Sequence, residues 1–349
     1  MADSSGGSTG VLSRFGPATR EWFGAAFAAP TAAQAGAWTA VAAGRHALVV
    51  APTGSGKTLA AFLWSLDRLA REPAPDDPRH RCRVLYVSPL KALAVDVERN
   101  LRAPLAGIRQ AATRLALPPP EITVGMRTGD TPADERRAFA RTPPDILITT
   151  PESLFLLLTS AARDALRGVE TVIVDEVHAV AGTKRGAHLA LSLERLDELL
   201  PAPAQRIGLS ATVRPLDECA RFLGGARPVD VVAPASAKTI EVSVQVPVED
   251  MTRLDEQEQP EDDLGRPRSA SIWPAVEERV HSLIRAHRST IVFTNSRRSA
   301  ERLCARLNEL AHEQTTAPTT GGVTPPAERA GRTPAEMMAQ AGACLLYHL

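Results

Sequence analysis

Short apolar runs recur along the chain, and stretches with helical periodicity separate them. The runs are apolar throughout instead of alternating, and they comprise residues 47–50, 84–87, 146–149, 172–174 and 207–210. Strands that are apolar on both faces are typical of parallel sheets covered by helices on each side. The pattern therefore predicts an α/β fold with a doubly wound parallel sheet, from about residue 10 to residue 232.

The stretches between the runs place apolar residues on one helical face. One such face carries Leu59, Phe62, Leu63, Leu66 and Leu69. A second stretch covers residues 186–200, with leucines in helical register. In sheets of this class, ligands bind beyond the carboxyl ends of the strands, so the residues that follow each apolar run are the first candidates for function.

The pattern changes after Pro228. Residues 240–246 alternate like a half-exposed strand, and residues 249–270 are polar and acidic, which predicts a loop. A helix is expected over residues 274–287, a strand over 290–293 and a helix over 297–310. These elements predict the beginning of a second α/β domain.

This pattern divides the chain into four parts. Residues 1–14 are expected to be disordered, 15–232 to form the first domain, 233–311 to begin the second, and 312–349 to form a linker-like tail. The Ser/Gly-rich start resembles neither a signal peptide nor a transit peptide. No apolar run is long enough to span a membrane, so we expect a cytoplasmic protein.

Charge and lysine usage sharpen this prediction. The 349 residues carry 40 basic and 40 acidic side chains, so any basic surface that binds nucleic acid must be local. Only four of the basic residues are lysines, and these are Lys57, Lys91, Lys184 and Lys238. Because arginine and lysine are not interchangeable where a compact charge meets phosphates, a lysine at position 57 is informative.

Lys57 belongs to a stretch with the features of a phosphate-binding loop, Ala51-Pro52-Thr53-Gly54-Ser55-Gly56-Lys57-Thr58. An apolar strand precedes it and a helical pattern follows, which is the context this loop requires. The backbone amides of Thr53 to Gly56 would surround a polyphosphate, Lys57 would reach the β- and γ-phosphates, and the Thr58 hydroxyl would ligate Mg²⁺. The alternative is a solvated lysine at the start of a helix. Ala51 stands where the general pattern has glycine.

A second cluster, Asp175-Glu176-Val177-His178, directly follows the run at 172–174. A carboxylate at the end of a buried strand can hold Mg²⁺ through water, and its neighbour can polarise the attacking water. The alternative is a pair of acids in a surface turn. Ser210-Ala211-Thr212 ends the next apolar run, where small hydroxyl residues could link the acidic site to a neighbouring surface.

With these motifs in order, the chain resembles superfamily 2 helicases, and further stretches narrow the resemblance to the Lhr (large helicase-related) family of bacterial DNA helicases. The stretches begin at Pro30, Ser88, Thr128, Thr149, Gly182 and Val292, in family order. The resemblance covers roughly residues 15 to 310. It implies a RecA-like first domain and an incomplete second RecA-like domain.

The resemblance also implies roles for residues at matching positions. Gln34 matches the adenine-reading glutamine, with a helix-surface glutamine as the alternative. Asp175 matches the residue that holds Mg²⁺, and Glu176 matches the base that activates water. The residues His178, Ser210 and Thr212 match those that couple the state of ATP to movement of the strand. The positions that match strand-tracking motifs are Pro89, Lys91, Gly129, Thr150 and Pro151. For Lys91 and Thr150, the alternative is a structural role at a strand end.

The expected function is that of an ATP-dependent DNA helicase or translocase with ATP and Mg²⁺ as cofactors. Its partner would be single-stranded or tailed duplex DNA, and the protein would be a monomer. Two alternatives stay open, a catalytically incomplete fragment that binds ATP and nucleic acid, and an RNA helicase. The first arises because no Gln-x-x-Gly-Arg-x-Gly-Arg stretch, which supplies arginine fingers in the family, occurs in the 349 residues.

Overall fold

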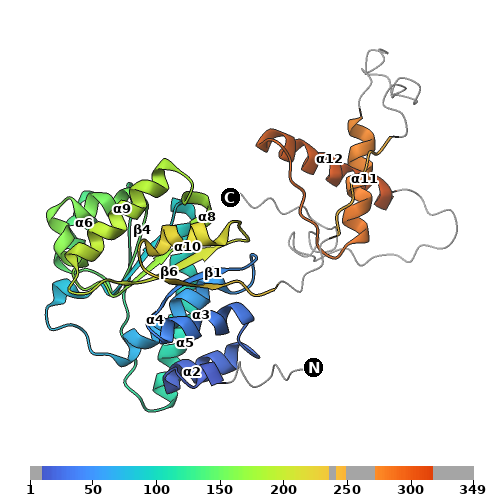
Figure 1. Ribbon diagram of the computed structural model, residues 1–349. Helices are drawn as coiled ribbons and strands as arrows, with labels where there is room; N and C mark the ends of the chain where they lie inside the picture. The colour runs from blue at the N-terminus through green and yellow to red at the C-terminus, as the bar shows by residue number, and fades with distance from the viewer. Residues whose placement is uncertain (1–9, 236–240, 249–271, 317–349) are drawn as a thin grey trace. The chain divides into compact units, whose positions relative to one another are not determined.

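The computed structural model describes residues 10–235, 241–248 and 272–316. The chain divides into two compact units, Met1–Lys238 and Thr239–Leu349. The first unit contains a sheet with helices on both faces (Figure 1). In the described part of the second unit, the regular structure consists of two helices.

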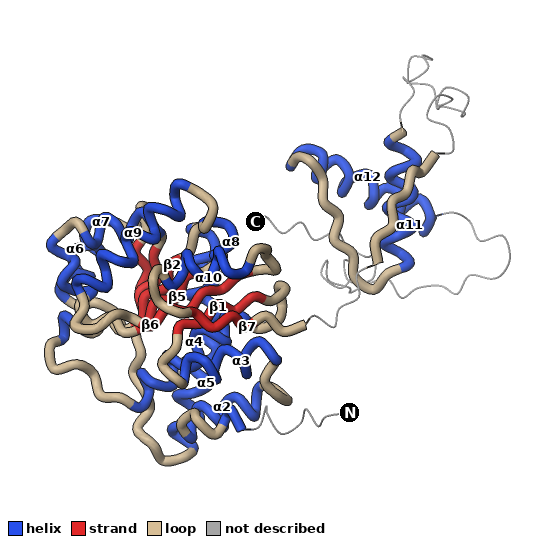
Figure 2. The backbone as a smooth tube through the Cα atoms, viewed as in Figure 1, coloured by secondary structure: helices blue, strands red, loops and turns tan. Residues whose placement is uncertain are grey.

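The sheet of the first unit has seven strands in the order β3-β4-β2-β5-β6-β1-β7, and every pairing is parallel. Figure 2 shows the strands in red between the helices of the two faces. The strands are β1 (His46–Val50), β2 (Val84–Val87), β3 (Val124–Arg127), β4 (Ile146–Thr149), β5 (Thr171–Val174), β6 (Gln205–Ser210) and β7 (Val229–Val232). Val50 pairs with Ser210, and Val87 pairs with both Thr149 and Val174. The carboxyl ends of the central strands therefore meet at one edge of the sheet.

Two sets of helices cover the two faces of the sheet (Figure 1). One face is covered by α2 (Pro17–Ala26), α3 (Ala32–Ala42), α4 (Lys57–Arg71) and α5 (Lys91–Arg114). The other is covered by α6 (Ala133–Arg141), α7 (Pro151–Leu158), α8 (Val177–Val180), α9 (Lys184–Leu199) and α10 (Leu216–Gly224). Two short 3-10 helices, η1 (Pro78–His80) and η2 (Ala161–Leu166), lie in connections.

Alternate residues of each strand face the two helical layers. In β1, Ala47 and Val49 belong to the core beside α3 and α4, whereas Leu48 and Val50 belong to the core on the opposite face. This explains why the runs are apolar at every position, since neither face of a central strand contacts water. The predicted RecA-like sheet is confirmed.

The start of the first unit differs from the prediction. Residues 10–14 were expected to be disordered, but Val11 is only 4% exposed and packs in the core with Phe15. None of the helices in the described ranges is long and apolar enough to cross a membrane. The rest of the predicted disordered start, the acidic loop 249–270 and residues 317–349 lie outside the described residues.

The second unit contains α11 (Trp273–Ala286) and α12 (Arg297–Thr316), which confirms both expected helices, although α12 extends into the predicted tail. The two expected strands are wrong for the residues described: 241–246 and 290–293 form no strand. The reason is physical. A strand needs a partner for its backbone groups, and here Val244 is 92% and Phe293 88% exposed, so their apolar side chains are not packed into a sheet.

Candidate nucleotide site and strand-binding surface

The loop between β1 and α4 has the backbone shape that its glycines allow. Gly54 and Gly56 have φ angles of 81° and 79°, a region that other residues rarely adopt. A Cβ atom on Gly56 would lie 2.5 Å from Nε2 of Gln34, so any larger residue there would displace the Gln34 side chain. The buried Ser55 hydroxyl has no hydrogen-bond partner. It is therefore available to a ligand.

Lys57 is the first residue of α4, and its side chain reaches back over the loop. The ammonium nitrogen donates hydrogen bonds to the carbonyl oxygens of Ala51, at 2.7 Å, and Pro52, at 3.0 Å. Burial lowers the pKa of Lys57, while the negative charges of Glu176 and Asp175 act in the opposite direction. The lysine thus lies within the electrostatic range of the acidic pair.

Gln34 ties the start of α3 to this loop. Its side chain accepts a hydrogen bond from the Thr31 backbone amide at 3.0 Å and donates one to the Gly56 carbonyl at 3.4 Å. The Thr31 hydroxyl caps α3 and also donates to the Ser55 carbonyl at 3.0 Å. Gln34 is 4% exposed, so it does not lie on a solvated helix surface.

The acidic pair lies immediately after β5. Asp175 Oδ1 accepts a hydrogen bond from the Glu176 amide at 2.9 Å, and the Tyr86 hydroxyl donates to Asp175 Oδ2. Glu176 has a positive φ of 46° and occupies the N-cap position of α8 without a side-chain capping hydrogen bond, so the backbone turns there between β5 and α8.

Groups of three or more His, Cys, Asp or Glu arranged for a metal do not occur in the described ranges. A metal here would thus take oxygen ligands from Thr58, Asp175 and a bound phosphate, a donor set that fits Mg²⁺.

His178 connects the acidic pair to the end of β6. Its Nδ1 accepts a hydrogen bond from the Ala211 amide at 3.2 Å and lies 3.2 Å from the Ser210 hydroxyl. The same nitrogen is 3.3 Å from the Glu176 carboxylate. The contacts join the predicted coupling residues His178 and Ser210, whereas Thr212 is exposed beyond them.

The strand-tracking candidates lie after β2, β3 and β4, which are neighbours in the sheet. Lys91 is the first residue of α5, and its ammonium pairs with the exposed Asp130 carboxylate at 2.7 Å. Gly129 lies within contact distance of this pair, since a Cβ atom there would be 3.6 Å from the Lys91 nitrogen. The side chain of Arg136 donates to the carbonyls of Gly129 and Thr131, each at 2.7 Å. This loop is therefore well anchored.

The other candidates contribute backbone more than side chain. Thr150 and Pro151 are buried, and the Thr150 hydroxyl accepts a hydrogen bond from the Ser153 amide as the cap of α7. Pro89 is buried as well. Any contact with phosphates would therefore come from exposed amides at the helix start. Two further residues stand out that the sequence patterns had not assigned, Tyr86 beside the acids and Arg185 at the start of α9.

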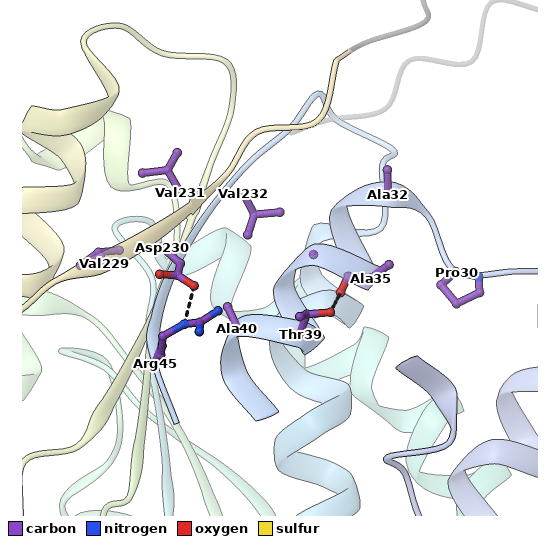
Figure 3. A pocket seen from close by; sticks show the side chains of 11 residues that line it. Pro30, Ala32, Ala35, Thr39, Ala40, Arg45, Val229, Asp230, Val231 and Val232 are labelled. Atoms are coloured by element: carbon purple, nitrogen blue, oxygen red, sulfur yellow. Dashed lines mark hydrogen bonds and ion pairs between the residues drawn. The ribbon is translucent and has the colours of Figure 1, made fainter. Parts of the chain in front are cut away.

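A shallow groove runs between α3 and the edge strand β7 (Figure 3). Small side chains of α3 line one wall and Val229 to Val232 the other, and an ion pair between Arg45 and Asp230 lies across one end. Pro30 and Ala32 form the opposite end and flank Thr31 in sequence. Residues of the loop 51–58 do not line it, so the phosphate site is separate from this groove.

Comparison with known proteins agrees with the geometry. The family model described as DEAD/DEAH box helicase matches residues 31–219. The chain belongs to this family. It is 62% identical over 327 residues to a Lhr helicase/probable uracil glycosylase of Mycolicibacterium smegmatis, and 56% identical over 315 residues to a Lhr helicase/uracil glycosylase of Escherichia coli. The resemblance to Lhr helicases is thereby confirmed.

A solved structure agrees as well. The helicase Lhr of Mycobacterium smegmatis bound to single-stranded DNA and AMP-PNP matches with a TM-score of 0.72 and 58% identity, covering 95% of this chain and 41% of that one. The two curated relatives are matched over 94% and 89% of this chain. This DEAD/DEAH box chain spans only 21% and 20% of their respective lengths.

Proposed function

We propose that this DEAD/DEAH box protein binds ATP with Mg²⁺ and acts as an ATP-dependent helicase or translocase on single-stranded or tailed duplex DNA. The observation that carries the proposal is that the loop 51–58 and the acidic pair follow β1 and β5, which both flank β6 in one parallel sheet, with Lys57 within electrostatic range of Asp175 and Glu176. The Mycobacterium smegmatis structure with single-stranded DNA and AMP-PNP supports the same classes of ligand here.

The phosphate end of the nucleotide would occupy the loop 51–58. Lys57 exchanges its hydrogen bonds with the Ala51 and Pro52 carbonyls for bonds to phosphate oxygens, which are charged and therefore stronger acceptors. Ser55, whose hydroxyl is buried and unpaired, donates to the same phosphates. The amides of Thr53, Gly54 and Gly56 complete the cradle. Gln34 reads the adenine from the start of α3.

Hydrolysis needs one group to hold the metal and another to activate water. Thr58 and Asp175 would hold Mg²⁺, and the ion would supply positive charge to the phosphate oxygens. Glu176, on the turn out of β5, orients and polarises the attacking water. His178 and Ser210, joined after β6, transmit the state of this site, with Thr212 facing solvent next to them.

The nucleic-acid strand would lie across the ends of β2, β3 and β4. Lys91 and the amides near Gly129, Thr150 and Pro151 contact phosphates, and Pro89 shapes the turn before α5. Contacts of this type fix the strand without reading base edges. DNA is proposed over RNA because the Mycobacterium smegmatis relative is bound to single-stranded DNA in its solved structure.

An ATP hydrolysis assay of the 349-residue chain tests the proposal, without nucleic acid and with a single strand of DNA or RNA of equal sequence. We expect slow hydrolysis, because an arginine finger is worth about 10³ to 10⁵ in rate and the 349 residues contain no Gln-x-x-Gly-Arg-x-Gly-Arg stretch to supply it. Stimulation by DNA above RNA supports a DNA translocase. A chain that binds nucleotide and DNA without any hydrolysis supports the non-catalytic alternative.

A further inference from the structure

Arg185 joins three segments that are far apart in the sequence. Its Nη2 donates to Glu152 Oε2 at 2.9 Å, its Nε donates to the other oxygen of the same carboxylate, and its Nη1 donates to the Pro89 carbonyl at 2.5 Å. One planar guanidinium thus holds a bidentate carboxylate and a backbone oxygen at once.

Each of the three segments has a place in the proposed function. Pro89 lies in the turn that leads from β2 to Lys91, the first residue of α5. Glu152 lies in the first turn of α7, directly after Thr150 and Pro151. Arg185 lies in the first turn of α9, the helix that follows the acidic pair and α8. Two strand-binding segments are therefore connected through a helix that follows the ATP site.

Arg185 holds Glu152 by two hydrogen bonds at the start of α7. The Glu152 carboxylate lies where the helix dipole favours anions and where a phosphate of the strand would also bind. A glutamate carboxylate is already ionised near neutral pH. The hydrogen bonds from Arg185 lower the pKa of Glu152 further, as expected for a paired carboxylate. Arg185 and Glu152 therefore fix each other's positions at the start of α7.

The pair contributes little to folding stability. The Arg185 side chain is 37% exposed and that of Glu152 is 56% exposed, and solvent screens the attraction between exposed charges. The geometry is nevertheless specific, since the fork of an arginine fits a carboxylate in a way that a lysine cannot. The pair therefore fixes the geometry of the Arg185 and Glu152 side chains while adding little to the stability of the fold, as expected for a residue that positions other groups.

We propose that Arg185 is a positioning residue of the strand-binding surface, which sets the spacing between the Pro89 turn and the start of α7 through its bonds to the Pro89 carbonyl and to Glu152. The inference rests on the proposed function, because it concerns the same surface. Arg185 acts through Pro89 and Glu152 and does not itself contact the strand.

The test measures binding of a fluorescein-labelled oligothymidylate to the 349-residue chain by anisotropy, with AMP-PNP and Mg²⁺ present. Arg185→Ala, Arg185→Lys and Glu152→Gln should each weaken DNA binding by about tenfold, as expected for the loss of one charge-assisted hydrogen bond. The matched control is Lys184→Ala, which removes one positive charge from the neighbouring, exposed position of the same helix turn. It should change the affinity far less.

Glu152→Gln separates positioning from direct contact. If Arg185 bound phosphate itself, freeing it from Glu152 would leave DNA binding unchanged or tighter, and that result would overturn the inference. So would a loss of AMP-PNP affinity or a lowered melting temperature in step with the loss of DNA binding, because either indicates a general structural role.

The unmodified chain separates this inference from the proposed function. If it binds no oligothymidylate, the proposed function fails and the inference fails with it. If it binds DNA and the Arg185 and Glu152 variants bind equally well, only the inference fails.

Discussion

The Tyr86 hydroxyl donates a hydrogen bond to the Asp175 carboxylate, from a strand neighbouring the one that carries the acid. Tyr86 is fully buried, and its ring stacks on Phe62 of α4 with ring centroids 5.1 Å apart. Burial, together with the nearby charge of Asp175, raises the pKa of the phenol, so Tyr86 stays protonated and donates. Asp175 is thereby held through both oxygens, since the other accepts the Glu176 amide.

Tyr86→Phe keeps the ring and removes only this donor. We expect the Mg²⁺ concentration needed for half-maximal ATP binding to rise by about tenfold, the lower range for losing a hydrogen bond that orients a metal ligand. A fluorescent ATP analogue titrated with Mg²⁺ measures this. Affinity in EDTA and the melting temperature serve as controls and should not change. An unaltered Mg²⁺ requirement would show that Asp175 needs no such support.

Lys57→Ala should weaken nucleotide binding by about 1.5 to 3 kcal/mol, because a charge-assisted hydrogen bond to the terminal phosphates is lost. The stability cost should be small, as the ammonium bonds only two loop carbonyls in the free protein. Equilibrium binding of a fluorescent ATP analogue tests this, with Lys184→Ala as the control for loss of one positive charge. Equal affinity in both variants rules the loop out as the phosphate site.

Glu176→Gln and Asp175→Asn should fail in different ways. In Glu176→Gln the metal-dependent binding of ATP persists but turnover is lost, because the amide cannot polarise water. In Asp175→Asn the Mg²⁺-dependent part of binding is itself reduced. Single-turnover hydrolysis and Mg²⁺-dependent binding, measured on both variants in a protein with measurable turnover, separate the two roles. Near-normal turnover by the Glu176→Gln variant contradicts the assignment of the base.

A buried ion network predicts how stability depends on pH. Asp197 is buried, which raises its pKa, but hydrogen bonds from Arg227, the Ala204 amide and Arg206 outweigh this and lower it. A lowered pKa in the folded state stabilises the protein above the unfolded value of about 4, and this stabilisation is lost as pH falls through the folded value. Acidification below about pH 4 should therefore reduce stability through this group.

Asp197→Asn should cost about 1.5 to 3 kcal/mol at neutral pH, since it removes one of the two carboxylates that pair with Arg206, which is only 1% exposed and keeps Glu194 as a partner. The variant should also lose less stability on acidification than the unmodified chain. Urea unfolding at several pH values checks both effects. The matched control is Asp164→Asn, which breaks an exposed pair with Arg167 and should cost at most about 1 kcal/mol.

Binding to single strands should be weak, salt-sensitive and independent of sequence. The chain has no net charge, so affinity depends on local phosphate contacts, and each contact lowers the logarithm of the binding constant with a slope of about −0.7 against the logarithm of salt. Titration of labelled strands of different sequence at two salt concentrations measures the slope. A preference for one sequence that persists at high salt contradicts this expectation.

The sheet could be predicted because the residues of its central strands are apolar where the strand is buried, and these strands are buried on both faces. Residues 84–87 and 146–149 are apolar at each position or nearly so, and both faces of these strands are buried. The edge strands β3 and β7 are short and partly exposed, so their sequences carry no comparable signal. The strands expected at 240–246 and 290–293 have apolar side chains in a suitable pattern, but that pattern cannot supply the neighbouring strand that pairing requires.

The candidate site was only partly predictable for a related reason. Lys57, Asp175 and Glu176 follow apolar strands closely, so their positions at the sheet edge could be inferred from order alone. Arg185 meets Glu152 across 33 positions and the Pro89 carbonyl across 96, and such meetings depend on packing. Tyr86 offered one signal, a polar hydroxyl in the middle of a buried strand, which usually requires a partner.

The ion pair between Arg45 and Asp230 affects whether copies of the protein can associate through the edge of the sheet. Strand β7 ends the sheet, and beyond it no strand of the described chain pairs with its free edge. Such an edge can recruit extended segments of other molecules. Asp230 and Arg45 remain 38% and 55% exposed there, on a strand that ends after Val232. Because the edge strand is short and carries an exposed charged pair, pairing with an edge strand of a second copy is unfavourable. This edge therefore disfavours aggregates that are linked strand to strand.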